Sequence, residues 1–271
     1  LTSHETCDIT DYTWSLGYYL MTTGDAVYAD AIEKAVFNAG PGAVTKDFKA
    51  LQYFSSVNQF IATGDSDHNE VKKGSTWMAY RPTHETECCA GNVHRFMPNY
   101  VSRMWLEGET EGELVAAMYG PSEVRHELPD GNVVTVTEDT AYPFGNEIRF
   151  VFSMDKSARF PFTFRVPSWC GDAEIRINGS GYDVIPDENG FVAIERGDCY
   201  ERGINITRFC DTTASESVCF SSSGQYGEAG SHKNATHLHM GGIAASKSTY
   251  AVTGKSERFY TSGNYADSGL A

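Results

Sequence analysis

Residues 4–38, HETCDITDYTWSLGYYLMTTGDAVYADAIEKAVFN, decide the fold of the first part of this chain. Apolar residues recur at three- and four-residue spacing from Ile9 to Leu20 and again from Tyr28 to Val36, which is the period of an amphipathic helix. Gly24-Asp25 separates the two runs, and Asp is a preferred helix N-cap because its carboxylate accepts bonds from free backbone N–H groups. Gly40 follows the second run as a stop signal. The pattern predicts a helical hairpin that ends at Gly40.

A third apolar stripe at helical spacing follows the segment Cys88-Cys89-Ala90-Gly91-Asn92. Its members are Val93, Phe96, Met97, Tyr100, Val101, Met104 and Trp105. They predict a helix, which Pro98 should kink because proline lacks the backbone N–H of the helical ladder. Residues 44–62 mix aromatic and β-branched residues with polar ones, which favours a short hairpin or an extended loop.

From about Glu107 the hydrophobic period changes to two, the period of β-strands. The alternating segments are Leu114 to Tyr119, Asn132 to Glu138, Ile148 to Met154, Phe162 to Val166, Ala173 to Ile177 and Gly190 to Ile194. Turn signals separate them at Pro129-Asp130-Gly131 and Asn178-Gly179. The pattern predicts an antiparallel β domain over residues 108–197. Residues 198–271 are rich in Ser, Gly, Thr and Ala without legible strands, so we expect an irregular or disordered tail, or an artefactual end to the reading frame.

Composition excludes several classes of partner. A formal net charge of −15 over 271 residues argues against a nucleic-acid backbone or an anionic membrane, since both require clustered Lys and Arg. No apolar run reaches the ~18 residues of a membrane span. The seven cysteines include the vicinal pair Cys88-Cys89, which suits a metal or a reducing compartment better than a disulfide framework. We therefore expect a cytoplasmic protein, with secretion as the alternative that its Asn-X-Ser/Thr sequons leave open.

Two segments could supply metal ligands: His4-Glu5-Thr6-Cys7 and His84-Glu85-Thr86-Glu87-Cys88-Cys89. Each leads into an apolar helical stripe, and thiolates together with a carboxylate can complete a four-coordinate zinc shell. The competing interpretation is that the cysteines are buried small hydrophobes, which is how free Cys usually behaves. From the residues alone, Glu85 and Glu87 compete with Glu5 as the oxygen ligand.

In their order, these motifs resemble glycoside hydrolase family 127, the β-L-arabinofuranosidase family. The resemblance rests on His4-Glu5-Thr6-Cys7, on Ala31 to Asn38, on Gln52-Tyr53-Phe54 and on Cys88-Cys89 before Asn92. It spans about residues 3–125 and continues less specifically to about residue 196. It implies an α+β fold in which residues 1–107 form the C-terminal part of an (α/α)6 barrel and residues 108–197 form an antiparallel β-sandwich.

For the site, the resemblance implies a zinc ion held by Glu5, Cys7, Cys88 and Cys89, with Cys88 also the nucleophile. It places Glu33 and Tyr53 where the family binds sugar hydroxyls. By pattern alone, Glu33 is instead an exposed charge on an amphipathic helix, and Tyr53 is equally a core aromatic.

The implied activity is hydrolysis, with retention of configuration, of a terminal β-L-arabinofuranosyl or similar residue on an oligosaccharide or glycan. In the family the general acid/base Glu precedes the Glu-Thr-Cys segment, so we expect an internal fragment without that group. His4 and the segment Ala90-Gly91-Asn92 depart from the best-known members of the family, which have Pro-Pro-Asn after the cysteines, and this leaves the sugar open. The alternative is a non-catalytic, zinc-stabilised carbohydrate-binding or structural module; a thiol-disulfide oxidoreductase is disfavoured because no CxxC motif is present.

Overall fold

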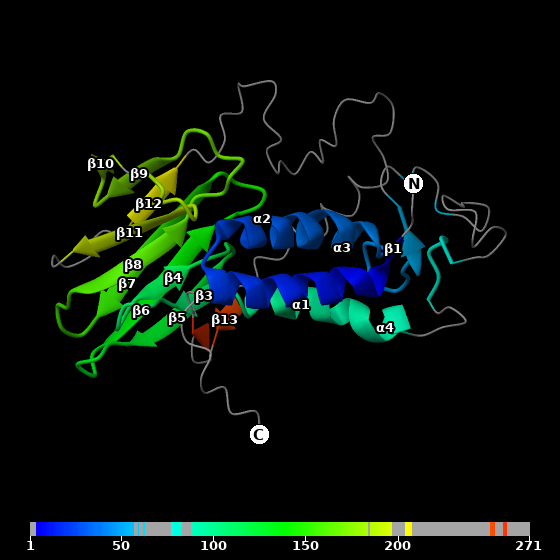
Figure 1. The fold of residues 1–271 in the computed structure, drawn as a ribbon, viewed down its shortest axis with the longest axis horizontal. Helices are drawn as coiled ribbons and strands as arrows, with labels where there is room; N and C mark the ends of the chain where they lie inside the picture. Colours follow the sequence, from blue (N-terminus) through cyan, green and yellow to red (C-terminus); the bar gives the residue numbers. More distant parts are fainter. Residues whose placement is uncertain are drawn as a thin grey trace.

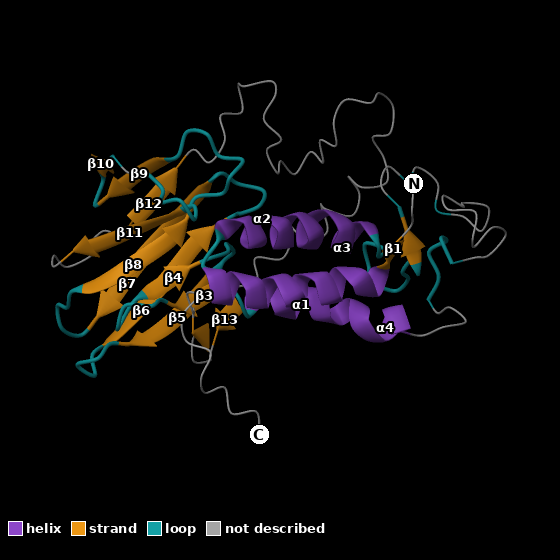
Figure 2. Ribbon diagram, viewed as in Figure 1, coloured by secondary structure: helices purple, strands orange, loops and turns teal. Residues whose placement is uncertain are grey.

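The computed structural model describes residues 4–56, 59, 62, 77–82, 88–183, 185–196, 204–207, 250–252 and 257–258. The fold is mixed α+β, with a few helices and several sheets. Figures 1 and 2 show helices α1 and α2 side by side, with the two larger sheets at one end of them and the small strand β1 at the other.

The predicted helical hairpin is confirmed. Helix α1 (Thr6–Thr23) ends at Gly24, whose φ of 70° is the left-handed conformation that glycine adopts most easily. Helix α2 (Ala26–Lys34) begins after Asp25, which accepts the N–H of Val27 at 2.9 Å, as an N-cap should. The hairpin therefore follows from its local signals.

The predicted stop at Gly40 is wrong. The helix continues as a π-helical turn (Ala35–Ala39) and the short α3 (Gly40–Gly42), with Gly40 at a right-handed φ of −59°. A Cβ on Gly40 would lie 2.8 Å from a ring carbon of Phe96. Glycine is present here for close packing against Phe96 rather than for helix termination.

The helix after the vicinal cysteines is broken, but not at Pro98. Helix α4 (Cys88–Asn92) passes into a 3₁₀ turn (Val93–Arg95) and then into α5 (Phe96–Val101). Pro98 falls in the first turn of α5, where no intrahelical bond needs its missing N–H. The predicted kink is therefore misplaced.

Among the described residues, the strands form three sheets. The strands are β1 (His4–Glu5), β2 (Phe54–Ser55), β3 (Trp105–Glu107), β4 (Leu114–Ala116), β5 (Ser122–Glu127), β6 (Val133–Thr140), β7 (Glu147–Met154), β8 (Phe160–Arg165), β9 (Glu174–Ile177), β10 (Ser180–Tyr182), β11 (Phe191–Arg196), β12 (Ile204–Thr207), β13 (Tyr250–Val252) and β14 (Glu257–Arg258). Their orders are β1-β2, β10-β9-β12-β7-β6-β5-β13 and β11-β8-β4-β3-β14. Most pairs are antiparallel, and β4–β8, β5–β13 and β3–β14 are parallel.

Aromatic side chains join the two larger sheets. Phe150 of β7 contacts Phe162 of β8 and Trp105 of β3, with ring centroids 5.1 and 5.8 Å apart. All three rings are buried. The seven- and five-stranded sheets therefore share one core.

The six predicted strand segments all contain strands, and further strands lie between and after them. Most of the predicted irregular tail lies outside the described residues. Within it, Ile204–Thr207 pairs between β7 and β9, so this part differs from the expectation of an irregular chain.

Among the described residues, no helix has the length and apolar character needed to cross a membrane. Helix α1 exposes several large side chains, with Tyr12, Trp14, Tyr18 and Tyr19 each 42–55% accessible.

Candidate metal and active site

Four of the predicted site residues converge at the end of the helices remote from the larger sheets (Figure 1). One ligand atom each from Glu5, Cys7, Cys88 and Cys89 lies within 4.8 Å of all the others. The Sγ of Cys7 is 3.9 Å from that of Cys88 and 3.4 Å from that of Cys89. Glu5 Oε2 is 3.1 Å from Cys7 Sγ. We call these four residues the cysteine cluster.

Backbone contacts bring the cysteine cluster together. Glu5 pairs with Phe54 in the β1–β2 ribbon, and the Thr6 N–H donates to the Tyr53 carbonyl at 3.0 Å. On the other side, the Thr10 hydroxyl donates to the Asn92 carbonyl at 3.2 Å, which ties α4 to α1. The first turn of α1 and the start of α4 thus meet across some eighty residues of sequence.

Burial favours the protonated forms of two of the cluster thiols, those of Cys7 and Cys89. Burial, then the hydrogen bond to Glu5, raises the pKa of Cys7, and burial raises the pKa of Cys89 to about 11. Three thiols and one carboxylate can each be neutral or negatively charged but never positive. A bound cation would therefore favour their deprotonated forms. Three sulfurs and an oxygen at these separations form a donor set suited to a tetrahedral zinc ion.

Tyr53 reaches the cluster from the side. Its hydroxyl lies 2.8 Å from Cys88 Sγ and 3.3 Å from Glu5 Oε2. Its ring is 4% exposed and packs with Val44, Leu51 and Cys89. Tyr53 is therefore a core aromatic whose polar end belongs to the site.

Two family models match the chain in tandem. The model described as the β-L-arabinofuranosidase GH127 catalytic domain matches residues 1–102, and the GH127 middle domain model matches residues 113–207. The chain belongs to glycoside hydrolase family 127.

One relative and two solved structures resemble parts of this chain. A non-reducing end β-L-arabinofuranosidase of Bifidobacterium longum subsp. longum is 22% identical over 190 residues, which are 66% of this chain and 27% of that protein. A solved GH127 β-L-arabinofuranosidase from Geobacillus stearothermophilus T6 superposes with a TM-score of 0.62 at 23% identity, covering 74% of this chain and 31% of that one. A solved GH127 β-arabinofuranosidase gives 0.60 at 18% identity, covering 75% and 32%. This chain thus spans about a third or less of the length of these relatives.

In this GH127 chain, Glu33 lies in a second cluster, at the helix–sheet junction. The Arg165 guanidinium donates to both Asp30 and Glu33, and Tyr142 donates to Glu33 at 2.7 Å. We call these four residues the Arg165 network. Burial raises the pKa of Glu33, and Arg165 opposes that rise.

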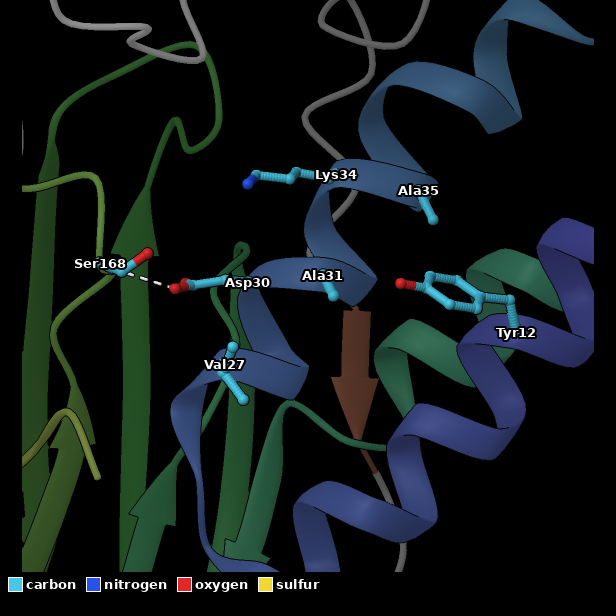
Figure 3. Close-up of a pocket in the computed structure, with 7 residues that line it drawn as sticks. All are labelled: Tyr12, Val27, Asp30, Ala31, Lys34, Ala35 and Ser168. Atoms are coloured by element: carbon cyan, nitrogen blue, oxygen red, sulfur yellow. Dashed lines mark hydrogen bonds between the residues drawn. The ribbon is translucent and has the colours of Figure 1, made fainter. Parts of the chain in front are cut away.

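The expectation of Glu33 as an exposed charge is wrong, because the side chain has no accessible surface. A sugar-binding role would require an accessible carboxylate, and it stays a prediction. Beside the network, a hollow of about 420 Å³ lies between α1, α2 and Ser168 (Figure 3). Asp30 accepts the Ser168 N–H there, and no member of the cysteine cluster lines the hollow.

Several other candidates from sequence have different outcomes. His4 contacts Ser55 across the β1–β2 ribbon, with His4 Nε2 and Ser55 Oγ 3.1 Å apart. His84, Glu85 and Glu87 lie outside the described residues, as do Cys199, Cys210 and Cys219. Cys170 is buried, as free cysteines usually are. Sequence reasoning did not single out Arg165, because nothing local to β8 indicates partners more than 130 residues away.

Proposed function

We propose that this chain carries the metal and nucleophile part of a retaining glycoside hydrolase acting on terminal β-L-arabinofuranosyl or similar residues of a glycan. The observation that carries the proposal is the convergence of Glu5, Cys7, Cys88 and Cys89 within 4.8 Å. Two of the proteins that this chain resembles are β-L-arabinofuranosidases, which supports the sugar class.

We propose the matching architecture as well. Residues 1–107 would contribute helices to an (α/α)6 barrel, and residues 108–197 would form a β-sandwich from the two larger sheets. The superposition on solved GH127 chains and the shared aromatic core of the sheets support this arrangement.

The four cluster residues would hold zinc, which when bound favours the thiolate forms of the cysteines at neutral pH. Cys88 suits the nucleophile role better than Cys89, because Cys88 is half-buried whereas Cys89 is 1% exposed. The Tyr53 hydroxyl, 2.8 Å from Cys88 Sγ, restricts where that sulfur can lie.

In the proposed reaction, the Cys88 thiolate attacks the anomeric carbon and the glycosidic C–O bond breaks. The departing oxygen takes a proton from a carboxylic acid, which the family resemblance places ahead of the Glu5-Thr6-Cys7 segment. Water then attacks the same carbon and gives a proton to the carboxylate left by the first step, the C–S bond breaks, and Cys88 returns as thiolate. Two inversions give net retention.

An aryl glycoside tests the nucleophile without needing the general acid, because p-nitrophenolate leaves unprotonated. Zinc-loaded protein mixed with p-nitrophenyl β-L-arabinofuranoside should release a burst of about one equivalent of p-nitrophenol per chain. Intact and peptide mass spectrometry should place one pentosyl group on Cys88. Cys88→Ser should abolish both signals, whereas Cys170→Ser, which changes a buried cysteine outside the cluster, should retain them.

A zinc-stabilised, non-catalytic module is the second candidate, because four protein ligands can close a tetrahedral shell. That candidate predicts stoichiometric zinc and higher thermal stability with zinc, but neither burst nor adduct. An unchanged burst in Cys88→Ser would remove the nucleophile assignment.

A further inference from the structure

Three aromatic rings gather beside the cysteine cluster. Phe54 and Trp77 stack with their ring centroids 5.5 Å apart and their planes 16° apart. Tyr53 touches both, with centroid distances of 4.9 Å to Phe54 and 4.6 Å to Trp77. Phe54 and Trp77 pack at the border of the apolar group that contains Cys7, Cys88 and Cys89.

The backbone holds the stacked pair in place. The N–H groups of Tyr53 and Phe54 both donate to the Trp77 carbonyl, at 2.9 and 3.0 Å. Phe54 is also the direct cross-strand partner of Glu5, one of the proposed zinc ligands. The position of the two rings relative to the cluster is therefore set by main-chain bonds as well as by packing.

The three rings differ in exposure. Tyr53 is buried, whereas Phe54 and Trp77 are half-buried. Glu5 shares the face of the ribbon with its partner Phe54, and its carboxylate lies 3.3 Å from the Tyr53 hydroxyl. Aromatic side chains beside a few polar groups are the usual lining of a small-molecule site.

We propose that Phe54 and Trp77 form the aromatic wall of a sugar subsite bordering Cys88, with the Tyr53 hydroxyl, which lies 2.8 Å from Cys88 Sγ, at its polar edge. A sugar ring has an apolar C–H face and a rim of hydroxyls, so it matches an aromatic surface flanked by hydrogen-bonding groups. The inference deepens the proposed function and rests on it for the class of ligand, while the wall itself rests on the ring geometry.

Saturation-transfer NMR with methyl β-L-arabinofuranoside tests the wall on the zinc-loaded chain. Trp77→Ala should weaken binding at least tenfold, and Phe54→Ala should weaken it less because the indole remains. Trp77→Phe should restore most of the affinity, since it keeps an aromatic face. Trp14→Ala removes a 42% exposed Trp on α1 and should leave binding unchanged.

Zinc content is the folding control, since Trp77 supplies no proposed ligand. One zinc per chain in Trp77→Ala, together with lost sugar binding, separates a subsite role from general unfolding. Equal affinity in Trp77→Ala and wild type, or no saturation transfer to the sugar by wild type, would overturn the wall. If Trp77→Ala does not fold, Trp77→Leu with its zinc content measured replaces it.

The adduct experiment keeps the two proposals distinguishable. A Cys88 adduct together with unchanged sugar affinity in Trp77→Ala means that the hydrolase stands and the wall is wrong. Trp77-dependent sugar binding without any Cys88 adduct means that the wall stands and the catalytic assignment is wrong.

Discussion

The Arg165 network and the cysteine cluster are both groups of ionisable side chains assembled over long stretches of sequence, but they differ in charge balance. In the network, Arg165 supplies the positive charge between Asp30 and Glu33, and none of these three side chains is more than 6% exposed. In the cluster, the four converging groups are three thiols and one carboxylate, and three of the four residues are half-buried.

This difference in charge balance determines what each group of side chains can bind. A buried charge that already has its counter-charge and hydrogen bonds needs nothing further from solvent. In a partly accessible group of thiols and a carboxylate, the deprotonated forms have no counter-charge unless a cation binds. The network therefore fastens α2 to β8, whereas the cluster could hold a metal ion.

The largest effect is expected from Arg165→Met, which leaves Asp30 and Glu33 buried without a counter-charge. Removing one partner of a buried pair costs about 3–5 kcal/mol, which is a large part of a typical folding free energy of ~5–15 kcal/mol. Urea denaturation of zinc-loaded protein should show this loss. Arg149→Met, at an exposed strand position, is the matched control and should change little.

The triple variant Arg165→Met, Asp30→Asn, Glu33→Gln sharpens the interpretation. It should recover part of the lost stability, because the uncompensated charges are gone. A single variant as stable as wild type would show that the network does not fasten helix to sheet.

In the cysteine cluster, Cys7→Ser should lower zinc affinity by about 100-fold or more, since loss of even an outer-shell partner costs ~10–100-fold. Zinc affinity of the wild type should rise with pH, because burial keeps the Cys7 and Cys89 thiols protonated and zinc must displace those protons. Competition with a chromophoric chelator at several pH values measures both effects. Cys170→Ser should bind zinc like the wild type.

Glu138 lies in neither the Arg165 network nor the cysteine cluster. Its carboxyl group is 1% exposed and accepts hydrogen bonds from the Gly120 N–H and the Ser122 hydroxyl. Burial raises its pKa well above the usual value near 4.5, so the folded state holds this proton more tightly than the unfolded state. Its stabilising contribution is full below about pH 4.3 and is lost as pH rises through the folded pKa.

Glu138→Gln should remove that pH dependence. Above about pH 4.3, the stability of the wild type should fall relative to the variant by at most roughly 1.4 kcal/mol per pH unit, the limit for one proton. Chemical denaturation across a pH series gives the comparison. Parallel stability curves for the two proteins would contradict the pKa assignment.

The smallest effect is expected from Lys49→Ala. Lys49 and Asp47 are 3.7 Å apart, but their side chains are 83% and 57% exposed. Exposed ion pairs contribute about 0–1 kcal/mol, so the midpoint of denaturation should barely move. A large loss would mean that solvent exposure does not separate the two kinds of charge pair.

Features with local causes were predictable from sequence. Asp25 caps α2 through a bond only two residues away, and Asn178-Gly179 turns the chain with φ of 52° and 84°, as a two-residue hairpin requires. The missed strand β5 has a physical explanation. Its buried positions are Ser122, Val124 and His126. Because two of these residues are polar, the sequence lacks the alternation of apolar and polar residues that indicates a strand.

Features that depend on distant partners were not predictable from pattern. Gly40 predicts the end of a helix, and only the packing of Phe96 against it explains why a glycine lies within the helix instead. The cysteine cluster was identified by family resemblance, since the spacing of Cys7, Cys88 and Cys89 fits no standard finger motif. The Arg165 network had no signal at all, because a charged residue in a strand is usually at the surface.

The long sequence separation of the cluster has a consequence for the unfolded chain. Cys7 and Cys88 are 81 residues apart, so an ion bonded to both would close a large loop. By analogy with a covalent crosslink, a closure of this length removes conformational entropy worth about 4–5 kcal/mol from the unfolded ensemble. A zinc ion at this position would therefore act as a reversible crosslink of the unfolded chain. Its removal would lower the free energy of unfolding as well as the proposed activity.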